Sequence, residues 1–483
     1  MASYPPPPVR EASPPPPPPL ALLPVAPPSL HDASLPALLP DNADHSLPGF
    51  AYSKHLVPAC AARTVPASYD LPRPDARLRA RKAERKAEMD RVAGVIKRVV
   101  TADEWWEGAG GGTDDARGYT PAAPLFNCLG RFRRMGGEVR AQPGLTLFFA
   151  HANGFNKETW YPTLRHLVSQ PAAASHIAEI WVWEAVHHGE AAVLNRAGLQ
   201  GFCQSFSTTP HWAVRLDPDT RLHPTDTWRD NTRDILNFLL HFIPAEASSS
   251  ALPAHLPRVS AAETAGRRSE GLPRRHVVAV GHSFGGCTSA LAALTAPRLL
   301  HSLVLVDPVI MCRASAHEIQ GVYNLTSAAV GRRARWATRE EAKQQFLASP
   351  FFQRWDPAVL DAYVEGGLHE RDGGVELRMT PLDEALMFAD ARTSPEVYER
   401  VPSLREDVEI RWVIPGPGER ELGSSEETRR RVWLRPRNSS NVRIEGAGHL
   451  IPQEQPERLA REIAAFVERK GGEIGRKPQI SKL

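Results

Sequence analysis

Short segments that are apolar throughout recur along the chain, and each ends in a turn. They lie at 144–155, 177–190, 276–280, 301–310, 408–416 and 441–450. Segments with apolar residues at helical spacing lie between them, notably 227–243 and 456–470. Strands that are apolar throughout and alternate with helices predict a mostly parallel sheet flanked by helices on both faces, which is the α/β class.

The segments outside this pattern predict the domain boundaries. Between about residues 312 and 405 the pattern becomes mostly helical, which predicts a helical cap inserted into an α/β domain of residues 119–470. The polar, proline-containing stretch at 245–272 predicts a surface loop of that domain. Residues 471–483 are predicted to form a C-terminal tail.

The N-terminal part differs in composition. Because 16 of the first 50 residues are proline, residues 1–70 are predicted to be a disordered, proline-rich tail that buries too little apolar surface to order itself. A solvated tail is favoured over a ligand for SH3 or WW modules. Residues 71–118 predict a charged helix at 73–100 and a flexible glycine-rich run at 108–118. The spacing of these glycines does not match a phosphate-binding loop.

The net charge, the apolar runs and the cysteine spacing argue against several classes of protein. A net charge of +3 over 483 residues, without one long basic run, argues against a nucleic-acid partner. No apolar run reaches the roughly 20 residues of a transmembrane segment, and the N-terminus does not resemble a secretory signal. The five cysteines lie far apart without a CxxC pair, which argues against a zinc site and fits a reducing compartment. No cofactor or metal is expected.

A candidate nucleophile lies at Ser283, in the sequence Gly-His-Ser-Phe-Gly. A Gly-x-Ser-x-Gly match alone is weak evidence for a catalytic serine, since glycine and serine are common. Here an apolar strand (HVVAV) precedes it and an alanine-rich helix (CTSALAAL) follows it. Flanking glycines allow the sharp strand-to-helix turn that exposes the serine hydroxyl. The pattern therefore predicts a nucleophile elbow rather than a structural turn.

A serine nucleophile needs a base and an acid, which follow it in the chain in folds with this elbow. Among 18 histidines, His449 is the candidate base because it follows the last predicted strand and precedes the last helix. Two acids are candidates: Asp307 at the end of one strand and Glu421 after the next. Asp307 is favoured because reactive groups gather at the carboxyl ends of parallel strands, and Glu421 remains the alternative.

An oxyanion hole is also needed for acyl transfer. The helix after the elbow begins at Phe284, whose backbone N–H is the first candidate donor. The second donor is expected from the loop after the first long strand, His-Ala-Asn-Gly-Phe at 151–155, with Asn153 as the candidate.

Several motifs together resemble one family, the fungal peroxisomal α/β-hydrolases, which include the yeast peroxisomal lipase and hydrolases of toxin biosynthesis. The motifs are FFAHANGF, HHGEAAVLNR, GHSFGG, LVLVDPV and GAGHL, and the resemblance covers roughly residues 119–470. It implies an α/β-hydrolase fold, with Ser283 as nucleophile, His449 as base and Asp307 as acid. Ala152, where the family usually has glycine, and Glu190-Ala191, where Asp-Ser is more common, depart from its pattern.

The chain ends in Ser481, Lys482 and Leu483. Serine-lysine-leucine at the C-terminus is a peroxisomal targeting signal that an import receptor reads. Together with the family resemblance, it predicts import into the peroxisomal matrix, with the import receptor as a partner.

These observations support three functional hypotheses. The first is a peroxisomal serine hydrolase that cleaves a small-molecule acyl ester or thioester, in the manner of a lipase or esterase. The second keeps the fold but places the protein in secondary metabolism, as a hydrolase or lyase acting on a CoA- or carrier-linked substrate. The third is a non-catalytic peroxisomal scaffold, against which a complete set of catalytic side chains argues.

Overall fold

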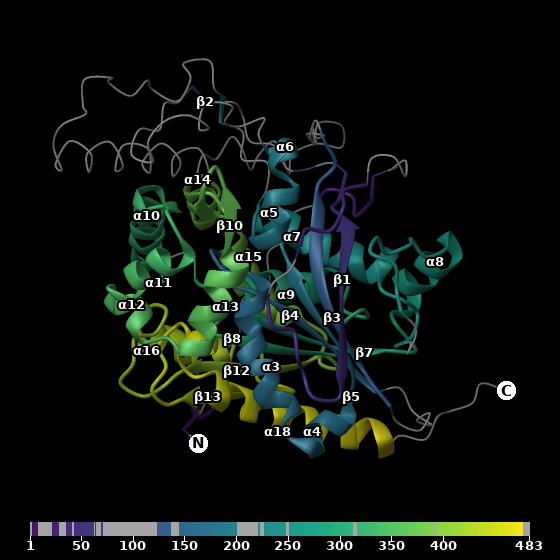
Figure 1. Ribbon diagram of the computed structural model, residues 1–483. Coiled ribbons are helices and arrows are strands. Elements are labelled where there is room, and N and C mark those ends of the chain that lie inside the picture. Colours follow the sequence, from purple (N-terminus) through teal and green to yellow (C-terminus); the bar gives the residue numbers. More distant parts are fainter. Residues whose placement is uncertain are drawn as a thin grey trace.

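The apolar segments of the sequence become neighbouring strands of one central sheet in the computed structural model (Figure 1). The structure describes residues 2–7, 22–28, 35–40, 43–61, 63, 69–70, 123–136, 144–199, 221–222, 227–247, 251–312, 316–390 and 392–476. Within them the sheet has eight strands in the order β1-β3-β5-β4-β7-β8-β12-β13. The bounds are β1 (Phe50–Pro58), β3 (Phe126–Arg134), β4 (Leu145–Ala150), β5 (Ile177–Glu184), β7 (His276–His282), β8 (Ser302–Val306), β12 (Glu409–Pro415) and β13 (Ser439–Ile444).

The sheet is mostly parallel, as predicted. All neighbouring pairs from β5 to β13 run parallel, whereas β3 runs antiparallel to both β1 and β5. The carboxyl ends of β4, β7, β8 and β12 therefore meet at one edge of the sheet, where the candidate site residues follow the strands.

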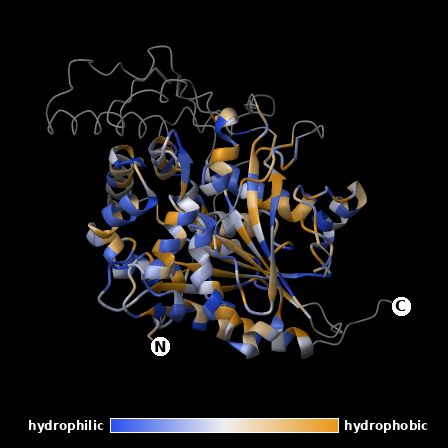
Figure 2. Ribbon diagram, in the orientation of Figure 1, coloured by the Kyte–Doolittle hydropathy of each residue, from blue (hydrophilic) through white to orange (hydrophobic). Residues whose placement is uncertain are grey.

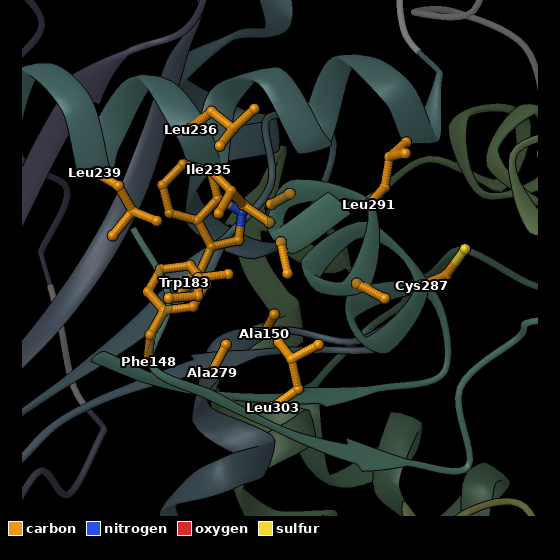
Figure 3. Close-up of a cluster of buried hydrophobic side chains, with 14 of the residues drawn as sticks. Phe148, Ala150, Trp183, Ile235, Leu236, Leu239, Ala279, Cys287, Leu291 and Leu303 are labelled. Carbon is orange, nitrogen blue, oxygen red and sulfur yellow. The ribbon is translucent and has the colours of Figure 1, made fainter. Parts of the chain in front are cut away.

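Helices cover both faces of the sheet and explain why its central strands are apolar. Along β4, Phe148 and Ala150 belong to one buried cluster with side chains of α7 (Trp228–Asn237) and α9 (Phe284–Thr295). The alternate residues Leu147 and Phe149 belong to a second cluster, with α3 (Tyr161–Val168) and α18 (Pro456–Arg476). Figure 2 shows the resulting hydrophobic strands between more mixed helices, and Figure 3 shows the first cluster. Strand β4 thus buries the side chains on both of its sides.

The helix predicted at 227–243 is present as α7 followed by one π-helical turn, η4 (Phe238–Phe242). A capping box between Thr227 and Asp230 begins it. The other elements around the sheet are β2 (Tyr69–Asp70), η2 (Lys157–Trp160), α4 (Pro171–His176), α5 (Gly189–Leu194), α6 (Arg196–Leu199), β6 (Arg221–Leu222), α16 (Ser425–Val432) and α17 (Ile451–Glu454).

An insertion between β8 and β12 occupies the region predicted as a cap. Its elements are α10 (Ala316–Gly331), β9 (Arg335–Trp336), α11 (Arg339–Leu347), α12 (Pro350–Gln353), α13 (Pro357–Gly367), β10 (Leu368–Arg371), β11 (Gly374–Leu377), α14 (Pro381–Ala389), α15 (Thr393–Arg400) and η5 (Val401–Ser403). The three-stranded sheet in the order β10-β11-β9 was not predicted. Its strands of two to four residues are too short to show a two-residue period.

Two boundaries in the C-terminal half differ from the predictions. The segment predicted as a surface loop at 245–272 contains a helix, α8 (Ala261–Glu270), which Ser260 begins by accepting a hydrogen bond from the backbone N–H of Glu263. The last helix, α18, continues to Arg476, beyond the predicted domain end at residue 470. In α8 the buried residues are Thr264 and Arg267, so the helix lacks an apolar stripe. Helix α18 continues through the glycines at 471 and 472, a residue type of low helix propensity.

The prediction of a disordered tail over residues 1–70 is wrong for strand β1. Residues 50–58 pair with β3 along their whole length, and Leu56 and Val57 are fully buried. Proline-rich flanks hide this strand in the sequence, and its partner lies about 75 residues later. Described parts of the flanks also contact the domain, since Arg233 donates hydrogen bonds to the carbonyls of Leu23 (3.0 Å) and Pro24 (2.7 Å).

The predicted helix at 73–100, the glycine-rich run at 108–118 and the targeting signal at 481–483 lie outside the described residues. Of the helices that the structure describes, none combines the length and the apolar character needed to cross a membrane.

Candidate active site

Ser283 lies at a strained turn between β7 and α9. Its backbone has φ 53° and ψ −114°, a conformation with positive φ that non-glycine residues rarely adopt. A side chain on Gly281 would place Cβ 2.5 Å from the carbonyl oxygen of Gly285. On Gly285, Cβ would lie 2.4 Å from the carbonyl oxygen of Ala150. The glycines of the predicted elbow are therefore required by the close approach of backbone segments.

We expect Gly285→Ala to lower the free energy of unfolding by about 3 kcal/mol, because the added methyl group overlaps the backbone of β4. The matched control is Gly266→Ala in α8, where no atom lies within 4 Å of the new Cβ. There alanine should raise stability by about 1 kcal/mol through its better helix propensity. Equilibrium unfolding in urea measures both changes. Equal stability of Gly285→Ala and the unsubstituted protein would contradict the expectation.

The structure brings Ser283, His449 and Asp307 together. His449 lies in the loop between β13 and α17, and its Nε2 is 3.0 Å from Ser283 Oγ. Its Nδ1 is 2.7 Å from Asp307 Oδ2. Asp307 follows β8 and is fully buried, whereas 29% of the His449 side chain is exposed. The three residues thus form one continuous hydrogen-bonded chain at the carboxyl edge of the sheet.

Asp307 is held in place by its backbone and by a buried arginine. Its N–H donates to the carbonyl of Val413 on β12 (2.7 Å), and its φ is 33°. Arg431 of α16 lies 3.1 Å from Oδ1, the carboxylate oxygen that His449 does not use, and is itself 1% exposed. Arg431 is a site residue that the sequence analysis missed. Its only sequence signal is an arginine-rich helix, which usually marks a solvated surface.

The alternative acid, Glu421, has other partners. It pairs with Arg443 (2.7 Å) and accepts a hydrogen bond from the hydroxyl of Tyr4 (2.9 Å). The structure therefore does not place Glu421 in the chain of hydrogen bonds that contains His449. Its carboxylate instead ties residues near the N-terminus to strand β13.

A second unpredicted residue, His282, supports the His449 loop. Its Nε2 lies 2.9 Å from the backbone carbonyl of His449. Burial lowers the pKa of His282 well below its ordinary value, so the ring is neutral and Nε2–H is the donor to that carbonyl. The sequence feature that could have identified His282 is its position directly before Ser283, at the end of a strand.

The loop of residues 151–155, which we call the β4 loop, packs against the elbow. The Gly285 N–H donates to the carbonyl of His151 (3.1 Å), and the ring of His188 stacks on that of Phe284 with centroids 5.8 Å apart. The side chain of Asn153 accepts from His188 Nε2 (3.0 Å). Because Phe284 begins α9, its backbone N–H has no acceptor within the helix. The structure thus brings the loop of Asn153 to the helix start at Phe284.

Two segments that follow Asn153 in the chain meet in a buried ionic cluster. Lys157 Nζ lies 2.6 Å from Glu158, 3.3 Å from Glu184 and 3.7 Å from Glu190. Glu184 also accepts backbone hydrogen bonds at the start of α5. Burial raises the pKa of Glu184 to about 7, against the opposing effect of the Lys157 ammonium. The cluster joins the segment after the β4 loop to the segment after β5.

Comparison with protein families gives a match to the Alpha/beta hydrolase family over residues 147–462. This range contains the elbow, the acid strand, the insertion and the histidine loop.

Curated relatives are fungal proteins. An abhydrolase domain-containing protein, ACTT2-1 of Alternaria alternata, is 35% identical over 106 residues, which cover 22% of this chain and 38% of that protein. The type I acyl-CoA thioesterase mpaH of Penicillium brevicompactum is 24% identical over 278 residues, 55% of this chain and 51% of that protein. The matches therefore span about two fifths to one half of these relatives.

A solved structure with the same fold is the peroxisomal alpha-beta-hydrolase Lpx1 of Saccharomyces cerevisiae. It superimposes with a TM-score of 0.57 at 16% sequence identity and covers 90% of this chain and 93% of that one.

Proposed function

Because this chain belongs to the alpha/beta hydrolase family, we propose that it hydrolyses a small-molecule acyl ester or thioester with Ser283 as nucleophile. The observation that carries this proposal is the pair of hydrogen bonds from Ser283 Oγ to His449 Nε2 (3.0 Å) and from His449 Nδ1 to Asp307 Oδ2 (2.7 Å). A hydroxyl, an imidazole and a carboxylate in this order provide the nucleophile, the base and the group that orients the base.

The first half of the reaction forms an acyl-enzyme. A carboxylate only accepts, so His449 Nδ1 carries the proton toward Asp307 and Nε2 presents its lone pair to the serine. As Ser283 Oγ attacks the carbonyl carbon, its proton moves to His449 Nε2. The oxyanion is bound by the backbone N–H groups of Phe284 and Asn153. The imidazolium then protonates the leaving alcohol or thiol as the bond to it breaks.

The second half releases the acid. A water molecule takes the place of the leaving group and gives a proton to His449 Nε2 while its oxygen attacks the acyl carbon. The second tetrahedral intermediate collapses when the bond to Ser283 Oγ breaks and His449 returns the proton to that oxygen. Asp307 stabilises the imidazolium in both halves, and Arg431 holds its carboxylate in place.

Covalent labelling tests this assignment. A fluorophosphonate probe is expected to phosphonylate Ser283 Oγ, because the probe reacts with serines that an adjacent base activates. Mass spectrometry of the digested protein locates the adduct. Ser289, a buried serine of α9, is the internal control and should stay unmodified. An adduct on another serine, with Ser283 unmodified, would contradict the proposal.

A second candidate is the hydrolysis of a CoA- or carrier-linked acyl thioester in secondary metabolism. The similarity to a fungal protein named as a type I acyl-CoA thioesterase favours it. Comparing kcat/KM for an acyl-CoA with that for an oxygen ester of the same acyl chain separates the two candidates. A higher value for the acyl-CoA supports the thioesterase.

We also propose that the protein acts in peroxisomes after uptake by the import receptor. The resemblance to a peroxisomal hydrolase of yeast supports this location, and so does the predicted signal at Ser481, Lys482 and Leu483. Fluorescence microscopy of the tagged chain, with and without these three residues, tests it.

A further inference from the structure

The β4 loop is held not only by the elbow but also by the insertion. Asn153 Nδ2 donates to the backbone carbonyl of Glu384 on α14 (3.2 Å). The ring of Phe155 packs edge-on against Trp355 and Tyr363, with centroids 5.3 Å and 5.9 Å away. The loop that carries the candidate oxyanion donor therefore takes part of its shape from a segment about 230 residues later in the chain.

Gly154 shows how closely the insertion approaches this loop. Its φ is 81°, and a side chain there would place Cβ 2.7 Å from Glu384 Oε1. The Glu384 carboxylate thus lies directly over the loop backbone, next to Asn153. A shift of α14 would move both the carbonyl that holds Asn153 and the carboxylate that covers Gly154.

Arg332 fixes the position of Glu384. Its Nη1 lies 2.5 Å from Glu384 Oε2, and its Nη2 donates to the hydroxyl of Tyr363 (2.8 Å). Arg332 follows α10, Tyr363 lies on α13 and Glu384 lies on α14, so one guanidinium connects three helices of the insertion. The side chains of Arg332 and Glu384 are 21% and 11% exposed, so salt screens this pair less than a surface pair.

We propose that Arg332 is a positioning residue for the oxyanion hole: by fixing Glu384, it holds Asn153 where its backbone N–H can bind the developing oxyanion. This inference rests on the proposed hydrolase function. If Arg332 has this role, the insertion contributes to catalysis, because its contacts determine the conformation of the β4 loop. A group misplaced by about 1 Å can lower a rate by about a hundredfold, so a modest shift of α14 is enough to matter.

A different role for Arg332 would give a different kinetic result. Arg332, Tyr363, Gly154 and Phe155 line a small pocket between the insertion and the β4 loop. If Arg332 only bound substrate there, its loss would raise KM and leave kcat unchanged. A positioning role acts on the transition state and therefore lowers kcat.

The test compares Arg332→Met with Arg333→Met. Arg333 is the adjacent arginine and pairs with Glu341 on the surface of the insertion (2.6 Å), which makes it a matched control. For Arg332→Met we expect kcat to fall between about tenfold and a hundredfold, with little change in KM. Arg332→Lys should recover part of the loss, since it keeps a positive charge near Glu384. Arg333→Met should retain the unsubstituted kcat.

Hydrogen exchange provides a readout that does not depend on activity. Peptides covering residues 151–155 should exchange faster in Arg332→Met than in Arg333→Met, because the β4 loop loses its support from α14. If Arg332→Met does not fold, Arg332→Lys and Glu384→Gln decide the question by the same two measurements.

The outcomes separate this inference from the proposed function. A rise in KM alone, or unchanged exchange of residues 151–155, would overturn the positioning role. Absence of any ester or thioester hydrolysis by the unsubstituted protein would instead remove the proposed function, and the exchange data would still show whether Arg332 supports the loop.

Discussion

Replacing Ser283 with alanine is expected to lower kcat for ester or thioester hydrolysis by about 10⁶-fold, the loss typical of removing the nucleophile from a catalytic triad. Alanine cannot form the acyl-enzyme, so only binding and oxyanion stabilisation remain. The substitution removes a single oxygen atom from a residue that is 7% exposed, so the fold should be retained. Steady-state kinetics with an activated ester measure the loss.

The control for this experiment is Ser289→Ala. Ser289 lies on α9, the helix that begins directly after Ser283. It is fully buried, and in the part of the chain that the structure describes its Oγ has no hydrogen-bond partner. Its replacement should leave kcat near that of the unsubstituted protein. Residual activity of Ser283→Ala above about one hundredth of the unsubstituted rate would contradict the assignment, since a triad nucleophile contributes far more than that.

Replacing Asp307 with asparagine is expected to lower kcat by about 10⁴-fold. An amide that donates to His449 Nδ1 places the ring proton on Nε2, so the imidazole can no longer accept the serine proton. The substitution also removes the negative partner of Arg431, a buried charge whose loss of pairing typically costs about 3–5 kcal/mol of stability. Urea unfolding therefore measures the stability of the variant alongside its kinetics. The kcat of Asp307→Asn is compared with that of the unsubstituted protein under conditions where both are folded.

Glu421→Gln is the matched control for the acid. It removes one carboxylate that follows the next strand of the same sheet and that pairs with Arg443. We expect a loss of stability, because the Glu421 side chain is 4% exposed and its replacement leaves Arg443 without this carboxylate partner. We expect kcat to stay within about threefold, because the pair lies away from the reacting groups. If Glu421→Gln lost activity and Asp307→Asn kept it, the assignment of the acid would be reversed.

The elements that the sequence predicts correctly are those whose pattern lies within a short run of consecutive residues. Strands β4, β7, β8 and β12 are short apolar runs flanked by turn residues, and helix α9 follows its strand directly. Ser283 could be assigned because the elbow and the elements on both sides lie within about 20 consecutive residues. His449 and Asp307 could be ranked because a parallel sheet gathers its strand ends at one edge.

Long-range partners account for what the sequence analysis missed. Strand β1 is apolar only in part, and its pairing with β3, more than 60 residues later in the chain, identifies it as a strand. Asp307 and Glu421 both follow strands, and their partners, Arg431 and Arg443, are known only once α16 and β13 are in place. The sequence could rank these acids, but the contacts that distinguish them join residues far apart in the chain.

By itself, then, the sequence determined the α/β class, the alternation of strands and helices, and the identity of the candidate nucleophile, because local periodicity and turn chemistry encode these features. Only the tertiary structure decided which acid bonds to His449, where the first strand lies, and that Glu384 of the insertion holds Asn153 of the β4 loop. These depend on hydrogen bonds and packing between distant segments, whose geometry no stretch of a few consecutive residues contains.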